Sequence, residues 1–286
     1  MFTPLHRRIG IALAMVVGIA LSTASPAAAI TGGDADGQRH PNVAMIAFYE
    51  PDGRFRCTAT LVTPTVLLTA AHCTAGTLGK TVVTFASQIA QQPPSGLPTA
   101  ADPAVGYQAT DALPAGYYRG TAHTHPGYSD FTDLDNWNDV GVVVLDAPVD
   151  GIAPAALAPV GFLDRFAQPV LNSTLFTIVG YGTEVRKSDA GPQKPTPQSY
   201  PLIRRYADAP GQRLTPQILQ VNGNINDTRG TGGSCFGDSG GPTFRDGVLV
   251  TVTSYGYTQN CRYLDGLQRV DIAVVQDWLA TFDVRP

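Results

Sequence analysis

The sequence is short of positive charge and, beyond residue 29, has no long hydrophobic run. It contains 19 Lys and Arg residues against 23 Asp and Glu residues, and two of the basic residues, Arg7 and Arg8, lie within the first 29 positions. The other 17 basic residues are outnumbered by the acidic ones, so nucleic-acid binding through a basic face is not expected. The apolar run Ile9 to Leu21 is shorter than the roughly 20 residues that a membrane-spanning helix needs. We therefore expect no membrane association of the mature chain.

Cysteine is also scarce, with four residues and no C-x-x-C pair. Such pairs are typical of structural zinc sites, and the His-x-His motif at His123 and His125 has no cysteine nearby. We therefore expect neither a metal nor another cofactor. In an exported protein, four cysteines predict two disulfides, for which three pairings are open.

The first 29 residues have the three parts of a secretory signal peptide. Basic residues precede the apolar run, and a stretch of small residues ends at Ala27-Ala28-Ala29. We predict cleavage after Ala29, secretion to the extracellular space, and a mature protein of residues 30–286 that begins at Ile30. Cleavage after Ala24 is the alternative, and it would leave residues 25–29 as a short propeptide.

The mature sequence has the pattern of a β protein. Short stretches rich in Val, Ile, Thr, Tyr and Phe alternate with Gly and Pro turns. The expected strands cover residues 43–49, 58–62, 65–69, 81–85, 140–145, 174–179 and 248–254. One amphipathic helix is expected near the end, from the three- and four-residue spacing of Val274, Val275, Trp278, Leu279 and Phe282. Long loops are expected at residues 88–116, 130–138 and 185–212, either inert or used in substrate selection or self-cleavage.

One serine lies in a glycine-rich loop, Gly233-Ser234-Cys235-Phe236-Gly237-Asp238-Ser239-Gly240-Gly241. A serine hydroxyl needs a histidine base and a set of oxyanion donors before it acts as a nucleophile. Gly237 and Gly240 allow a tight turn that leaves the amides of residues 237 and 239 free to point at one position. The same composition suits an ordinary turn, so the loop alone leaves both interpretations open.

Two other segments contain suitable partners for this serine. His72 follows an apolar stretch, and Asp139 immediately precedes the hydrophobic run from Val140 to Leu145. In a Ser-His-Asp triad the acid is buried and orients the histidine, which takes the proton of the serine. The G-x-S-x-G elbow of α/β-hydrolases also fits residues 237–241. In that fold the histidine follows the serine, whereas all five histidines here precede Ser239, which excludes it.

Three motifs in this order resemble those of the chymotrypsin-like (trypsin-family) serine proteases, of the secreted bacterial type. They are TAAHC at residues 69–73, NDVGVVVL at 138–145 and GDSGG at 237–241. The resemblance extends from Ile30 to about Trp278. It implies one protease domain with an all-β fold, in which two antiparallel six-stranded β-barrels and a C-terminal α-helix place the active site between the barrels.

The resemblance also implies roles for individual residues. The catalytic residues would be His72 as general base and acid, Asp139 as orienting acid and Ser239 as nucleophile, with the amides of Gly237 and Ser239 as oxyanion hole. The disulfides would be Cys57–Cys73 and Cys235–Cys261. The free ammonium of Ile30 would form an activation ion pair with Asp238.

The pocket for the residue before the cut is expected at Gly233 and Ser234, with Ser254, Tyr255 and Gly256 as one wall. No carboxylate stands at residue 233, which argues against simple trypsin-like selection of Arg or Lys. The orientation of Asp265 could change this specificity. Directed inward it would admit basic side chains, and directed to solvent it would leave a pocket for apolar ones. We expect broad or apolar selection.

The sequence therefore predicts a serine endopeptidase that hydrolyses proteins or peptides through an acyl-enzyme. We expect a monomer, with proteinaceous inhibitors as further partners. A catalytically silent, protease-like binding protein is the alternative, although such proteins usually lack a triad member and all three residues are present here. A metal-dependent hydrolase is a more distant third interpretation.

Overall fold

The structure is a computed structural model that describes residues 30–185 and 198–286, and its regular elements are almost all antiparallel β-strands. The predicted signal peptide, residues 1–29, lies outside the described residues. Among the described residues, no helix has the length and apolarity required to cross a membrane.

The first barrel is closed and is built from residues 43–145. Its strands pair in the order β2 (Val43–Glu50), β3 (Gly53–Thr63), β4 (Val66–Thr69), β8 (Gly141–Leu145), β7 (Tyr117–Thr124) and β5 (Leu78–Thr84), and β5 pairs again with β2. Apolar side chains such as Ile46, Leu61 and Val143 fill its interior. The register of β4 with β8 sets Thr69 opposite Gly141, which brings the ends of these two strands together.

The second barrel closes in the same way. Its strands pair in the order β13 (Arg205–Leu214), β14 (Ile218–Asn222), β17 (Leu264–Arg269), β16 (Val248–Gly256), β15 (Pro242–Arg245) and β9 (Leu175–Gly180), and β9 pairs again with β13. The short strand β1 (Asp34–Ala35) joins the edge of β13. Phe176, Leu219 and Leu267 lie in the core of this barrel, together with Ile30.

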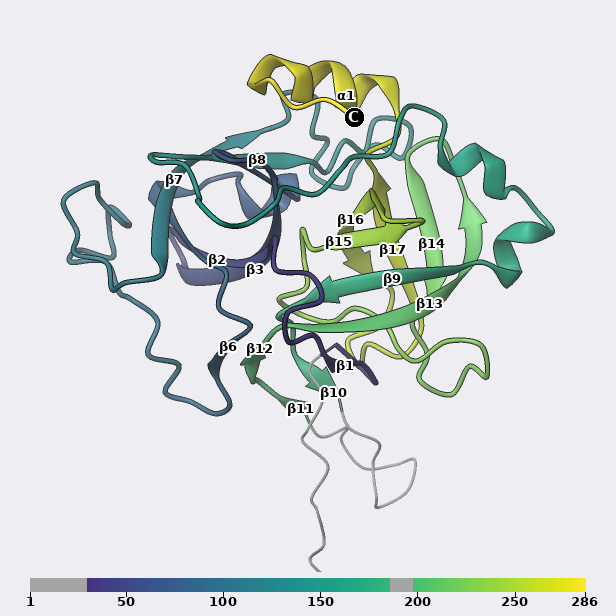
Figure 1. Ribbon diagram of the computed structural model, residues 1–286, viewed down its shortest axis with the longest axis horizontal. Helices are drawn as coiled ribbons and strands as arrows, with labels where there is room; N and C mark the ends of the chain where they lie inside the picture. The colour runs from purple at the N-terminus through teal and green to yellow at the C-terminus, as the bar shows by residue number, and fades with distance from the viewer. Residues whose placement is uncertain (1–29, 186–197) are drawn as a thin grey trace, which may run out of the picture.

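Smaller elements surround the barrels. They are the strand pairs β10 (Glu184–Val185) with β11 (Gln198–Ser199) and β12 (Leu202–Ile203) with β6 (Gln88–Ala90), the 3₁₀ turns η1 (Ala71–Cys73), η2 (Leu163–Phe166), η3 (Val170–Ser173) and η4 (Ala280–Phe282), and the helix α1 (Ala273–Leu279). In Figure 1 the purple-to-teal first barrel lies beside the green-to-yellow second barrel, and α1 lies across the top. One apolar cluster joins all three parts through Leu68, Val252 and Leu279.

The predicted fold is confirmed, because both six-stranded antiparallel barrels and the C-terminal helix are present. Each of the seven expected strands overlaps an observed one. Two of the expected loops were partly wrong: β6 lies within residues 88–116, and β12 and most of β13 lie within 185–212. Weak strand formers such as Asp208 and Pro210 hide β13 in the sequence, although Ala207 and Ala209 are buried. In α1, Val274 is 44% exposed and does not belong to the buried stripe.

Candidate active site

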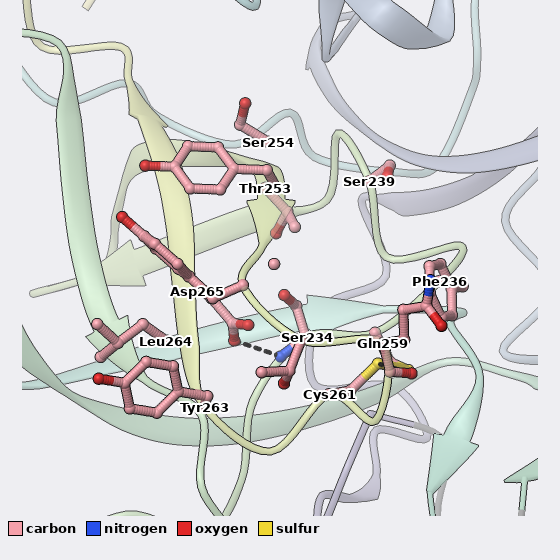
Figure 2. A pocket seen from close by; sticks show the side chains of 15 residues that line it. Ser234, Phe236, Ser239, Thr253, Ser254, Gln259, Cys261, Tyr263, Leu264 and Asp265 are labelled. Atoms are coloured by element: carbon pink, nitrogen blue, oxygen red, sulfur yellow. Dashed lines mark hydrogen bonds between the residues drawn. A yellow bond between two sulfur atoms is a disulfide. The ribbon is translucent and has the colours of Figure 1, made fainter. Parts of the chain in front are cut away.

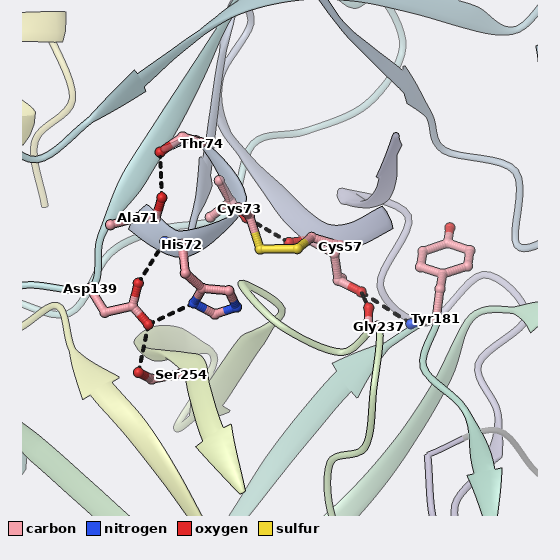
Figure 3. The surroundings of a disulfide bond; sticks show 11 residues. Cys57, Ala71, His72, Cys73, Thr74, Asp139, Tyr181, Gly237 and Ser254 are labelled. Carbon is pink, nitrogen blue, oxygen red and sulfur yellow. Dashed lines mark hydrogen bonds and ion pairs between the residues drawn. A yellow bond between two sulfur atoms is a disulfide. The ribbon is translucent and has the colours of Figure 1, made fainter. Parts of the chain in front are cut away.

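Strand pairing brings His72 and Asp139 together. His72 lies in η1, shortly after β4, and Asp139 lies two residues before β8, the partner strand of β4. His72 Nδ1 is 2.9 Å from Asp139 Oδ2, and the backbone N–H of His72 donates a second 2.9 Å hydrogen bond to Oδ1 (Figure 3). The Asp139 side chain is fully buried, whereas that of His72 is 22% exposed. The carboxylate therefore holds the imidazole in one orientation while part of the ring faces solvent.

The second barrel contributes further contacts to Asp139. Ser254 on β16 donates a 2.6 Å hydrogen bond from Oγ to Asp139 Oδ2, and Trp137 donates from Nε1 to the same Ser254 Oγ at 2.9 Å. Gln268 on β17 accepts a 3.0 Å hydrogen bond from the Asp139 backbone N–H through Oε1. Both carboxylate oxygens and the backbone N–H of this buried acid therefore have partners, and residues of both barrels fix its position.

Both disulfides form with the predicted pairing, Cys57–Cys73 and Cys235–Cys261. The first bond ties the residue after His72 to strand β3. Cys57, His72 and Cys73 are the only three candidate metal ligands that cluster within the described ranges, but the two sulfurs are bonded to each other and so do not offer thiolates. The second bond joins the Ser239 loop to the segment before β17.

The loop that carries Ser239 is anchored on strand β3 through Thr58. The Thr58 backbone N–H donates to Ser239 O at 2.8 Å, and Thr58 Oγ1 donates to Gly237 O at 2.9 Å. Gly240 has a φ of +73°, and a Cβ at this position would lie 2.0 Å from Thr69 Oγ1. The amides of Gly237 and Ser239 donate to no acceptor in the described part of the chain. Within the same residues, no hydrogen bond joins Ser239 Oγ to His72.

Asp238, beside this serine, is buried within hydrogen-bond donors. Its carboxylate accepts from the backbone N–H of Gly182 at 2.7 Å and from that of Cys235 at 2.8 Å. Burial raises the pKa of Asp238 to about 7. The expected ion pair with Ile30 needs a free amino terminus, so it belongs to the processed protein and stays a prediction.

A cavity of about 260 Å³ opens next to Ser239 (Figure 2). Five of the six expected pocket residues line it: Ser234, Ser254, Tyr255, Gly256 and Asp265. The sixth, Gly233, is not among the lining residues and lies against the Asp265 side chain. A Cβ added at Gly233 would be 2.6 Å from Asp265 Oδ2. The Asp265 carboxylate is directed toward this cavity and accepts a 2.7 Å hydrogen bond from the Ser234 backbone N–H. Burial raises the pKa of Asp265 to about 7.

The sequence profile described as "Trypsin" matches residues 30–279. The chain belongs to the trypsin family. A trypsin from Saccharopolyspora erythraea is 30% identical over 230 residues, which cover 79% of this chain and 86% of the relative. A brachyurin from Leptuca pugilator is 29% identical over 237 residues, which cover 80% and 88%.

Solved structures agree on the trypsin-family fold. A structure titled HL collagenase has a TM-score of 0.60 at 18% identity and covers 89% of this chain and 97% of its own. Human heparin binding protein has a TM-score of 0.57 at 18% identity and covers 90% and 98%. The family and its curated relatives make this trypsin-family chain a serine endopeptidase that acts on proteins or peptides. Secretion, the bacterial type, the monomeric state and protein inhibitors stay predictions.

Several residues of this trypsin-family site had no role predicted from the sequence. Trp137 and Gln268 contact the Asp139 network, and Phe236, Tyr257 and Tyr263 line the cavity. The three cavity aromatics are more than half exposed, at 51% to 56%. For Trp137 the position two residues before Asp139 was an available signal. Gln268 lies on β17, far away in sequence, and only the assembled barrels bring it to Asp139.

Proposed function

We propose that this trypsin-family enzyme cleaves peptide bonds through a covalent intermediate on Ser239. In the first step Ser239 Oγ bonds to the carbonyl carbon of the substrate, and its proton passes to His72 Nε2. The imidazolium then gives this proton to the leaving amine as the C–N bond breaks, which leaves an acyl-enzyme. A water molecule then gives one proton to His72 and its hydroxyl group to the acyl carbon. The bond between this carbon and Ser239 Oγ breaks, and His72 returns the proton to Oγ.

The observation that carries this proposal is the hydrogen bond between Asp139 Oδ2 and His72 Nδ1. An ionised carboxylate only accepts, so Nδ1 carries the ring proton and Nε2 of the neutral ring is free to act as base. The amides of Gly237 and Ser239 add support, because neither has an acceptor in the described residues and both are available to a developing oxyanion.

A serine-directed phosphonylating or sulfonylating reagent tests this role. It should label the enzyme at Ser239 and abolish peptide hydrolysis, whereas a chelator should have no effect. Ser239→Ala should lose the label and retain only the residual catalysis, on the order of 10³–10⁴ over water, that binding and the oxyanion hole provide. Ser173→Ala, at an exposed serine of η3, is the matched control and should behave as wild type. Labelling that persists in Ser239→Ala would contradict the proposal.

The proposed primary specificity is broad and includes both apolar and basic side chains. Aromatic side chains, Tyr255 and Tyr257 among them, line the cavity and suit apolar groups, and the Asp265 carboxylate suits the ammonium or guanidinium of a longer side chain. Peptides that differ only at the residue before the cut test this specificity. Cleavage restricted to Arg and Lys, or complete rejection of both, would contradict it.

The proposed route to the active enzyme is export followed by cleavage between Ala29 and Ile30. Ile30 is fully buried, and Thr31 pairs with Gly233 through a 3.1 Å hydrogen bond, so the start of the mature chain is packed beside the pocket. An ammonium at Ile30 would there supply the positive charge that the buried Asp238 lacks. N-terminal sequencing of the freshly secreted protein should find Ile30. A species that begins at Ser25 and is inactive until trimmed would contradict direct activation.

A further inference from the structure

A second cavity lies next to the Ser239 loop and has a different chemical character. It measures about 480 Å³, and its lining includes Arg54 and Arg56 of β3 and Gly237 of the loop. Phe236 lines both this cavity and the one that contains Asp265. The two cavities therefore adjoin at Phe236. We call the second one the arginine cleft.

Neither arginine of the arginine cleft forms an ion pair in the part of the chain that the structure describes. Among residues 30–185 and 198–286, no Asp or Glu lines the cleft, and no carboxylate oxygen lies within 4.0 Å of the guanidinium of Arg54 or Arg56. Arg54 donates a 2.8 Å hydrogen bond to the backbone carbonyl of Pro98, which leaves its charge in place. The half-buried Arg56 makes no hydrogen bond to the described part of the chain.

Because Arg56 is half-buried, its lack of a hydrogen-bond partner in the described residues has an energetic cost. A guanidinium that has lost part of its hydration and has not gained hydrogen bonds is less stable than in water, and burial lowers the pKa of Arg56. The nearby Asp238 attracts Arg56 electrostatically, but its carboxylate accepts from two backbone amides and forms no hydrogen bond or ion pair with Arg56. A ligand carboxylate would restore both the charge balance and the hydrogen bonds of Arg56.

The position of Arg56 indicates which part of a substrate it would meet. Its Nε lies 3.1 Å from the place that a Cβ on Gly237 would occupy, next to an amide of the proposed oxyanion hole. Arg56 also precedes Cys57, which is bonded to Cys73, the neighbour of His72. If the residue before the cut occupies the cavity of Asp265, the residues after the cut leave past His72 and enter the arginine cleft. An extended peptide advances about 3.3 Å per residue, so the first two of these residues are within reach.

We propose that Arg56, supported by Arg54, selects substrates with an acidic side chain at the first or second residue after the bond that is cut. This inference rests on the proposed function of Ser239, and it adds a charge preference on the leaving side of the substrate. Arg56 pairs with the substrate carboxylate, while Arg54 at the exposed mouth attracts it. The preference is electrostatic and therefore weakens as salt increases.

Internally quenched peptides test this preference. The peptides are amidated at the C-terminus, so that a side chain supplies the one carboxylate, and they differ only in Glu, Gln or Lys at the first or second residue after the cut. For the wild-type enzyme at low salt, kcat/KM for Glu should exceed that for Gln about fivefold, the upper range for a partly exposed ion pair. The Lys peptide should be the slowest. Equal values for Glu and Gln at both positions would overturn the proposal.

Variants locate the source of the preference. Arg56→Gln should reduce the Glu-to-Gln ratio to about one, Arg56→Lys should keep part of it, and Arg54→Gln should reduce it less. Arg165→Gln, at an exposed arginine of η2, is the control and should keep the full ratio. Because each ratio is taken within one variant, a change in overall activity or yield does not affect it. A full ratio in both Arg56→Gln and Arg54→Gln would overturn the assignment.

The two levels of the hypothesis fail in different ways. If the proposed function of Ser239 is wrong, Ser239→Ala will cleave all of these peptides as wild type does. If only the inference about the arginine cleft is wrong, cleavage will depend on Ser239 but will be the same for Glu and Gln.

Discussion

The indole Nε1 of Trp137 donates a 2.9 Å hydrogen bond to the hydroxyl oxygen of Ser254. An indole N–H can only donate, so the Ser254 oxygen is the acceptor and its own proton is directed to Asp139, 2.6 Å away. The direction of donation along this chain of hydrogen bonds is therefore fixed from Trp137 to the acid that orients His72.

The first prediction concerns this hydrogen-bond chain. Trp137→Phe keeps an aromatic ring beside Tyr255 but removes the N–H, which frees the Ser254 hydroxyl to rotate away from Asp139. We expect kcat/KM to fall about three- to tenfold, in line with the loss of one hydrogen bond to a charged network. Phe166→Leu, which removes a ring that packs on Phe162 and Phe176 and no hydrogen bond, is the control for the loss of aromatic packing. An unchanged kcat/KM in Trp137→Phe would contradict a positioning role.

The second prediction is that primary specificity depends on pH. Burial raises the pKa of Asp265 to about 7, so the carboxyl group is neutral at lower pH and charged at higher pH. The ratio of kcat/KM for Lys to that for Leu at the residue before the cut should therefore rise from about pH 6 to about pH 8. A pH effect that is common to both substrates cancels in the ratio. Asp265→Asn should give a low ratio at every pH, and a rising ratio in that variant would exclude Asp265 as the source.

The same shift predicts how stability changes with pH. The folded-state pKa of Asp265 lies above the usual value of 3.8, so the folded protein holds this proton more tightly than the unfolded chain does. Its contribution to the free energy of unfolding is most favourable below the unfolded pKa and is lost as pH rises through the folded pKa of about 7.

Asp265→Asn should therefore gain thermal stability relative to wild type as the pH increases from about 5 to about 8. Differential scanning calorimetry of the two proteins at both pH values measures this difference. Asp246→Asn, at an acid whose side chain is 52% exposed, is the control and should show little change with pH. A difference in stability that shrinks with rising pH would show that Asp265 is ionised more easily than its burial indicates.

A fourth prediction tests the close contact at Gly240. Gly240→Ala would place a Cβ 2.6 Å from the carbonyl oxygen of Thr58, at a φ of +73° that only glycine adopts without strain. We expect a loss of activity of 100-fold or more, on the order of 3 kcal/mol in the transition state, because the Ser239 loop must move. Gly247→Ala has a similar φ of +81° but no atom within 4 Å of the new Cβ. It should cost about 1 kcal/mol of stability and leave activity intact. Equal effects of the two changes would mean that the contact at Gly240 is unimportant.

The sequence predicted the barrels well where strands are continuous apolar runs, as in β4 and β8. It missed β13, where Asp208, Pro210 and Gly211 interrupt the pattern, because pairing with β9 and β14 outweighs the local preference of these residues. The disulfide pairs followed from the family resemblance, and the structure forms both.

The position of Asp265 shows why the pocket was harder to predict. A slip of one residue in a strand moves each side chain to the other face, so the sequence left open whether this acid is directed inward. In the structure Asp265 pairs with Gly256 on β16 and with Val221 on β14, and this register directs its side chain inward. Gln268, three residues farther along β17, contacts Asp139 because the two barrels pack together. A sequence pattern contains no information on such a contact between barrels.

Asp139 belongs to the first barrel, yet Ser254 and Gln268 hold it from the second. Any separation of the two halves would remove these partners while the strands within each half were still paired. Gradual heating or denaturant should therefore abolish hydrolysis before the far-ultraviolet signal of the sheets is lost. The temperatures and denaturant concentrations at which the enzyme is active would then depend on the contact between the two barrels and not on the stability of either barrel.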